Sequence, residues 1–358
     1  TKGADDLNVT RIQLAEGVYL TYLPDRKFKT SLLSAQFVTP IRRENAAAHA
    51  LLTAVLRRGT VSCPDMGVLS ARLDKLYGAR IDYTIRKKGE NQYVGFVASF
   101  IDDSFAPGKE KLLEPVAELL GEMICEPATK HGRFIPAYFE SERTNLTDAI
   151  RSIINDKRDY ADMRLLQEMC AGEAYGISRL GDEESLAKLQ PKKLYAQYTK
   201  LIATSRLELF YCGSAALERV ERAFRSAFST LPREDIGGIA IAELHRKPEQ
   251  VRYLQEEMDV TQGKLGMGFS CGSEDTPALL MGNTLFGGSS NSKLFMNVRE
   301  KQSLCYSIHS SYYGVKGILT VSAGIDCDKR ELVTEEVLRQ LSLCRKGEIS
   351  PEEITAAR

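Results

Sequence analysis

The sequence predicts an α+β fold with two homologous domains, each a mostly antiparallel sheet with helices packed on one face. Strand-like runs, in which apolar residues occupy nearly every second position, alternate along the chain with runs of helical spacing. The order helix, glycine, short helix, strand pair occurs once in each half. A length of 358 residues suits about two domains. We expect them at residues 1–233 and 244–358, joined by a linker at 234–243.

The first half begins with two β-rich runs, 18–23 and 31–38, which a polar turn separates, so we expect a β-hairpin. Ala/Leu-rich helical spacing predicts a helix over 44–58 that ends at Gly59. A second helix over 66–77 stops at the next glycine. The remaining elements are a strand pair at 81–85 and 93–100, helices at 109–125, 136–171 and 183–201, a strand at 206–212 and a helix at 217–228.

The second half repeats this order from a strand at 263–269 onward. Its further elements are a helix at 277–286, a short helix at 294–302 and a strand pair at 306–313 and 317–325. Ser350 and Pro351 are typical first residues of a helix near the end of the chain. That helix covers only about two turns, too few for stability in isolation. We therefore expect the second domain to be truncated here and to continue beyond residue 358.

Composition and charge narrow the range of functions. The 48 Lys and Arg balance the 48 Asp and Glu, which argues against a surface for nucleic acid or for anionic membranes. No run of about 20 apolar residues predicts a membrane-spanning helix. The eight cysteines are too far apart for CxxC-type motifs, so we expect free thiols and a cytoplasmic location. The four histidines leave little room for metal or acid–base chemistry.

The clearest motif is a histidine, His49, at the start of an apolar helix that ends in Gly-Thr. This stretch resembles the zinc helix of the insulinase/pitrilysin peptidases, the inverzincins, whose signature is His-x-x-Glu-His. In that family both histidines bind zinc, and the glutamate acts as the general base. Only His49 matches here, because Leu52 stands at the position of the base and Thr53 at that of the second ligand. We expect His49 to be hydrogen-bonded to a neighbour rather than to hold a metal.

The third zinc ligand of the family is a glutamate on a later helix. The segment from Glu142-Arg143 matches the pattern around that ligand and places Ala149 at the ligand position. Asp148 is one residue away, which turns its side chain by about 100° around the helix. The resemblance therefore implies no metal and no cofactor in this chain, with zinc only in a partner subunit.

The segment 77–84 resembles an edge strand that pairs with the substrate peptide in active relatives. The family's Asn-Ala pair is replaced here by Ile81-Asp82. Because backbone pairing needs no particular side chain, we expect that a peptide groove can survive the loss of catalysis.

The second half retains a long block, 286–307, that closely resembles the family's C-terminal domain. In that block the family uses an arginine and a tyrosine seven residues apart to bind substrate carbonyls and to stabilise the tetrahedral oxyanion. Arg299 and Tyr306 have this spacing. The alternative assigns Arg299 to an interface salt bridge and Tyr306 to the packing of a strand.

Near its start the same block has a run of small residues. The family uses this run as a loop that faces the closed chamber in which peptides are cleaved. This loop consists of Gly287, Gly288, Ser289, Ser290 and Asn291. It lacks the Gly-Lys-Ser/Thr ending of a phosphate-binding loop, so we do not expect nucleotide binding.

The resemblance implies a zinc-less, non-catalytic bacterial family member. We expect it to form a clamshell with a zinc-bearing paralogue, or as a homodimer, and to offer Arg299 and Tyr306 in trans during peptide cleavage. A peptide-binding or scaffold protein without peptidase function is the alternative. A zinc endopeptidase with atypical ligands is a third possibility, which the replacements at Leu52, Thr53 and Ala149 disfavour.

Overall fold

The computed structural model describes residues 9–245, 248–272 and 275–357. Their contacts divide the chain into two units, which are described one at a time. The N-terminal unit contains the residues up to 150 together with 177–240, and the C-terminal unit contains 151–176 together with the residues from 241 onward. Residues 151–176 thus pack with the second half of the chain. The domain limits expected from the sequence, 233 and 244, stay a prediction.

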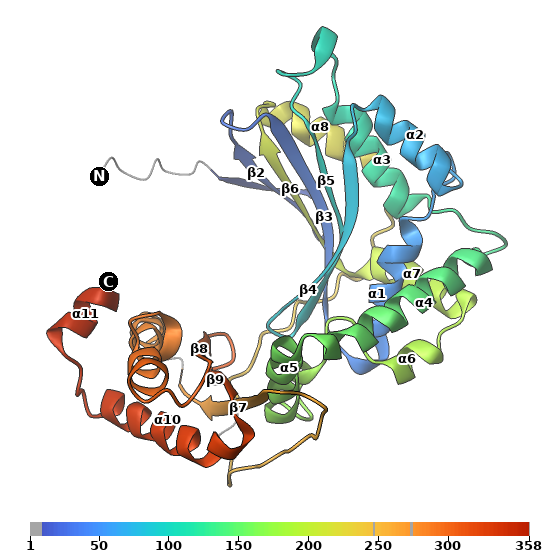
Figure 1. Cartoon of the computed structure of the whole chain (residues 1–358). Coiled ribbons are helices and arrows are strands. Elements are labelled where there is room, and N and C mark those ends of the chain that lie inside the picture. The colour runs from blue at the N-terminus through green and yellow to red at the C-terminus, as the bar shows by residue number, and fades with distance from the viewer. Residues whose placement is uncertain (1–8, 246–247, 273–274, 358) are drawn as a thin grey trace. The chain divides into compact units, whose positions relative to one another are not determined.

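The N-terminal unit is built on a six-stranded sheet in the order β1-β2-β6-β3-β5-β4 (Figure 1). All neighbours are antiparallel except β2 and β6, which are parallel. The strands are β1 (Thr10–Ala15), β2 (Val18–Pro24), β3 (Thr30–Pro40), β4 (Arg80–Lys88), β5 (Asn91–Ile101) and β6 (Arg206–Gly213). The predicted pair at 81–85 and 93–100 is confirmed as β4 and β5.

The hairpin expected from residues 18–23 and 31–38 is wrong, because β6 lies between β2 and β3. Every second residue of β6 is buried, from Leu207 to Gly213, and both of its edges form ladder hydrogen bonds. A polar turn between two strands suggests local pairing, but it cannot show that a strand from far along the chain enters between them.

Figure 1 shows the helices of this unit on one side of the sheet. They are α1 (Arg43–Leu56), α2 (Met66–Lys75), α3 (Leu113–Cys125), α4 (Pro136–Ser152), α6 (Glu183–Ala187), α7 (Pro191–Thr204) and α8 (Leu217–Ala227). The helix expected over 136–171 is interrupted after α4, and α5 (Lys157–Met169) begins anew. Asp156 caps α5 by accepting hydrogen bonds from two backbone N–H groups. The helix expected over 183–201 is divided where Pro191 starts α7.

The C-terminal unit has a three-stranded antiparallel sheet in the order β7-β9-β8. The strands are β7 (Gly263–Ser270), β8 (Ser307–Tyr313) and β9 (Ile318–Ile325). The helical elements are α9 (Thr276–Asn283), the π-helical segments η4 (Thr284–Gly288) and η5 (Leu294–Lys301), α10 (Arg330–Arg345) and α11 (Pro351–Ala357). Short 3-10 turns occur in this unit at Ile153–Asn155, Ala174–Gly176 and Cys327–Lys329, and in the N-terminal unit at Pro107–Lys109. The sheet order repeats β3-β5-β4 of the first unit, which confirms the duplication seen in the sequence.

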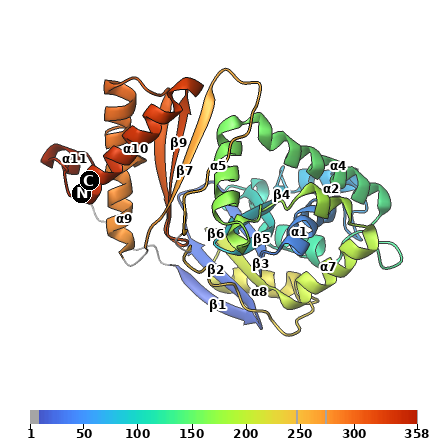
Figure 2. The same cartoon turned by 90° about the horizontal axis from the view of Figure 1, so that it is seen from below.

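Figure 2 shows α9 and α10 on one side of this sheet and α5 on the other. The α10 side packs a core around Phe286, Val321 and Val333. On the α5 side, glycines in β7 permit close approach, since a Cβ at Gly268 would stand 2.0 Å from Met169 Sδ. None of the helices in the described residues is both long and apolar enough to cross a membrane.

Candidate functional site

His49 lies in the middle of α1 and is buried, with 4% of its surface exposed. Its Nδ1 is 3.1 Å from Oε1 of Gln92 on β5. The Gln92 amide group donates to the carbonyls of Ala46 and Arg179, at 3.0 and 2.7 Å, so Oε1 is the acceptor and Nδ1 of His49 carries the proton. Burial lowers the pKa of His49 to about 4. The imidazole is therefore neutral at physiological pH and is held by a hydrogen bond, as the sequence suggested.

The other degenerate positions of the zinc helix belong to the core of the unit. Leu52 is fully buried, and the buried Thr53 hydroxyl donates to the carbonyl of Ala50 at 3.0 Å. Ala149 lies exposed on α4 beside the exposed Asp148. Among the residues that the structure describes, one group of three potential metal ligands occurs, and it includes none of these positions.

Arg299 and Tyr306 are brought together in the C-terminal unit. Arg299 lies on η5, and Tyr306 immediately precedes β8. Arg299 Nε donates to the Tyr306 carbonyl at 2.9 Å, and its guanidinium stacks 4.6 Å from the centre of the Phe295 ring. It also forms an ion pair of 2.8 Å with the adjacent Glu300. Three contacts thus fix the position of the guanidinium.

The Tyr306 side chain is 52% exposed, so it does not pack in the core. Its hydroxyl donates to Oδ1 of Asp326 at 2.7 Å, and Asp326 also pairs with Lys329 at 3.1 Å. This hydrogen bond and the negative charge of Asp326 raise the pKa of Tyr306, because they stabilise the protonated phenol. Tyr306 is therefore a neutral phenol that a carboxylate orients.

Both side chains line one open cleft of about 360 Å³. Its lining residues are Arg299, Glu300, Ser303, Leu304, Cys305, Tyr306, Asp326 and Lys329. We call these residues the Arg/Tyr cleft. The spacing of seven residues identified Arg299 and Tyr306 in the sequence, but Asp326 and Lys329 were missed. They come from the end of β9 and the turn behind it, and no sequence pattern connects them to Tyr306.

The segment expected to face a chamber begins in the last two residues of η4, Gly287 and Gly288, and continues beyond it. Gly287 is buried there, and a Cβ on it would lie 2.6 Å from Oγ of Ser310 on β8. Gly288, Ser290 and Asn291 are exposed, and Ser289 is half-buried. The structure thus gives Gly287 a packing role, while the contact of this loop with a peptide stays a prediction.

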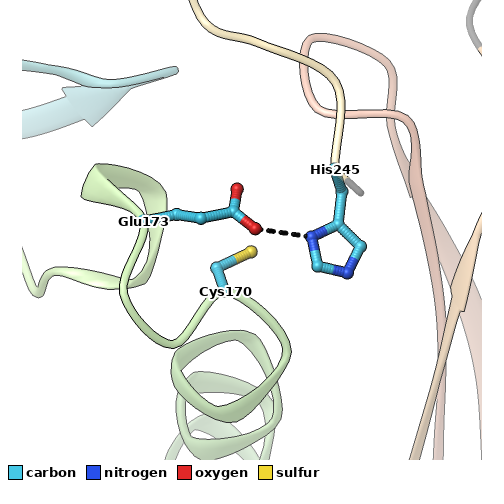
Figure 3. Close-up of side chains that lie close together, drawn as sticks. All are labelled: Cys170, Glu173 and His245. Atoms are coloured by element: carbon cyan, nitrogen blue, oxygen red, sulfur yellow. Dashed lines mark hydrogen bonds and ion pairs between the residues drawn. The ribbon is translucent and has the colours of Figure 1, made fainter. Parts of the chain in front are cut away.

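The sequence analysis did not identify a further group, which includes His245. Figure 3 shows His245 facing Glu173 and Cys170 at the end of α5. The spacing of three residues between Cys170 and Glu173 is a possible signal, but it does not reveal a histidine more than 70 residues later.

The chain is 33% identical to a protein of Bacillus subtilis (strain 168) described as "Probable inactive metalloprotease YmfF". The alignment spans 332 residues, which is 92% of this chain and 78% of that protein. The chain belongs to the M16 peptidase family. A family model described as "Peptidase M16 inactive domain" also matches residues 188–358. Membership confirms the resemblance to the insulinase/pitrilysin peptidases.

Two solved structures share the fold of this chain. A conserved protein from Enterococcus faecalis V583 superimposes with a TM-score of 0.90 at 29% identity, covering 98% of this chain and 83% of that one. A peptidase M16 inactive domain from Pseudomonas fluorescens gives 0.78 at 19% identity, covering 98% and 82%. The chain is thus an inactive homologue of the M16 metalloproteases, in keeping with the loss of the zinc ligand positions at Thr53 and Ala149.

Proposed function

We propose that this M16 homologue pairs with a zinc-bearing M16 paralogue and supplies Arg299 and Tyr306 to the peptide-cleaving site of that partner. The observation that carries the proposal is the Arg/Tyr cleft, in which a fixed guanidinium and an oriented phenol reach solvent side by side. Fixed cationic and phenolic donors suit the carbonyl oxygen of a peptide, which becomes negatively charged as the tetrahedral intermediate forms.

Arg299 has donors to spare for this task. A guanidinium carries five N–H groups, and the contacts described above use one on Nε and one on Nη1. The remaining N–H groups have no partner among the described residues and face an open cleft. Since Glu300 neutralises part of the charge, the site suits a neutral peptide carbonyl better than a polyanion.

A partner is needed because the chain has no metal site at α1. A homodimer would unite two copies that both lack Glu and His at the positions of Leu52 and Thr53, so a heterodimer is the assembly we propose for catalysis. No disulfide joins any of the cysteines in the described residues, which suits a reducing bacterial cytoplasm.

The test mixes the chain with a zinc-bearing M16 protein from the same organism and measures cleavage of unstructured peptides. We expect Arg299→Ala and Tyr306→Phe each to lower kcat/KM by about 100-fold, the usual effect of removing an oxyanion donor. Arg339→Ala is the matched control, because this exposed arginine of α10 pairs, within the described part of the chain, only with Glu336 on its own helix. Cleavage that ignores both cleft substitutions would refute the role in trans.

A peptide-binding scaffold is the second candidate, and the position of β4 favours it. This strand is at the edge of the six-stranded sheet, so one of its sides has no strand partner among the described residues. An extended peptide can add to such an edge through backbone hydrogen bonds alone. Peptide binding by the isolated chain, together with no cleavage by any mixture, would support this function over the first.

A further inference from the structure

Three potential metal ligands meet in the C-terminal unit, where α5 ends. Cys170 closes α5 through a hydrogen bond from its N–H to the Leu166 carbonyl. The following turn returns Glu173 beside it, with the Glu173 N–H donating to the Cys170 carbonyl at 2.9 Å. His245 arrives from the extended segment before β7, and its own N–H donates to the Lys316 carbonyl at 2.8 Å. Each ligand is therefore held in place by backbone hydrogen bonds.

We propose that Cys170, Glu173 and His245 bind a divalent transition-metal ion, with zinc as the best match. The three ligating atoms all lie within 4.8 Å of one another, close to the separations that a tetrahedral ion requires. Thiolate, imidazole and carboxylate are the ligand types that zinc prefers, whereas calcium and magnesium select oxygen alone. Water fills the fourth position.

The burial of the ligands fits a site with one access route. The Cys170 thiol is completely buried, and the His245 side chain is 7% exposed, whereas 27% of the Glu173 side chain reaches solvent. Figure 3 shows the imidazole turning Nδ1 toward the carboxylate, with the thiol directed into the same space. An ion can enter along Glu173 and meet the two softer ligands behind it.

The Glu173 carboxylate has one oxygen for each of two partners. Oε1 lies 2.9 Å from Nδ1 of His245, and Oε2 lies 2.5 Å from Nζ of the buried Lys316. The ion takes the place of the proton between Oε1 and Nδ1, and that proton moves to Nε2. Lys316 keeps Oε2 and orients the carboxylate, as hydrogen-bond donors behind metal ligands commonly do.

The charges balance when the thiol ionises. Zinc forms a bond to sulfur, and the Cys170 proton is released to solvent, so binding weakens as the pH falls. The positive charge of Lys316 opposes the ion and keeps the affinity below that of a site without a lysine. Both features predict reversible binding that chelators can compete for.

The test uses the full-length chain, stripped of metal with a chelator and then exposed to zinc before gel filtration. We expect about one zinc per chain in the wild type, and the loss of that zinc in Cys170→Ser and in His245→Ala. Cys271→Ser and His309→Ala are the matched controls, because they remove a thiol and an imidazole of the same unit outside the group. Both controls should retain the zinc.

Binding of Co²⁺ tests directly whether the Cys170 thiolate is a metal ligand. Bound Co²⁺ should give a thiolate-to-metal charge-transfer band in the near ultraviolet that Cys170→Ser abolishes and Cys271→Ser preserves. Added zinc should also raise the Tm of the wild type by about 5 °C, with no rise in Cys170→Ser. Equal zinc uptake by the wild type and Cys170→Ser, or no uptake by either, would overturn the proposal. None of these three measurements needs a partner protein, so the result is independent of the role in trans.

Discussion

The burial of the neutral His49 predicts how the free energy of unfolding depends on pH. Burial lowers its pKa from the ordinary value of 6.5 to about 4. Between these values the unfolded chain binds a proton that the folded chain cannot accept, so acid favours unfolding. One pKa unit corresponds to about 1.4 kcal/mol, so His49 should remove about 3 kcal/mol of stability as the pH falls from 7 to 4. Below about pH 4 the folded chain is protonated too, and the loss should level off.

The perturbation is His49→Gln, which removes the titrating group and keeps a donor for Gln92. Denaturant unfolding, followed by circular dichroism, should show the wild type losing about 3 kcal/mol more than the variant over this pH range. The unfolding transition to compare is the one whose denaturant midpoint differs between the wild type and His49→Gln. Nuclear magnetic resonance adds a direct reading, because only four histidines contribute imidazole signals. Parallel pH curves for the two proteins, or titration of His49 near pH 6.5, would refute the reasoning.

Two other substitutions test the C-terminal unit. Asp326→Asn should lower the pKa of the Tyr306 phenol, because the carboxylate that stabilises its protonated form is gone. Ultraviolet titration against Tyr306→Phe measures the shift, and an unchanged pKa would contradict the assigned hydrogen bond. Gly287→Ala should destabilise the unit by about 1–3 kcal/mol, because its Cβ would stand 2.6 Å from Ser310 Oγ. Gly282→Ala, where a Cβ meets nothing within 4 Å, should be neutral or stabilising in the same thermal unfolding assay.

The predictable part of the fold is the part that neighbouring residues encode. Helical spacing identified α1, and alternation identified β4 with β5, since each pattern reflects burial on one face of a single element. The insertion of β6 between β2 and β3 depends on pairing across more than 160 residues, and no local pattern records it. The helix α10 (Arg330–Arg345) was also missed, although it carries the buried Val333 and Val337.

The residues of the candidate site also differ in whether the sequence alone could identify them. Arg299 and Tyr306 could be identified because their spacing lies within one continuous block. Asp326, which orients the phenol, lies 20 residues later, directly after the end of β9, and its position beside Tyr306 depends on the register of β8 with β9. The sequence did not connect His245 with Cys170 and Glu173, because only the folded C-terminal unit brings the three side chains together.

The zinc helix and the Arg/Tyr cleft could diverge separately because they belong to units with separate cores. On α1 the positions of the general base and of the second zinc ligand now carry residues that pack: Leu52 buries an apolar side chain where a carboxylate would need a partner, and the Thr53 hydroxyl donates to a carbonyl of its own helix. Restoring a glutamate at Leu52 alone would bury an unpaired charge, and restoring a histidine at Thr53 alone would bury an unpaired imidazole. The packing of α1 therefore disfavours a return of the zinc site by single substitutions. In the second unit Tyr306 stays exposed and held by Asp326, and an exposed, oriented phenol gains nothing from the core. Packing in the core thus accounts for Leu52 and Thr53 on α1, whereas it does not account for the exposed Tyr306, which fits the role that we propose for the Arg/Tyr cleft.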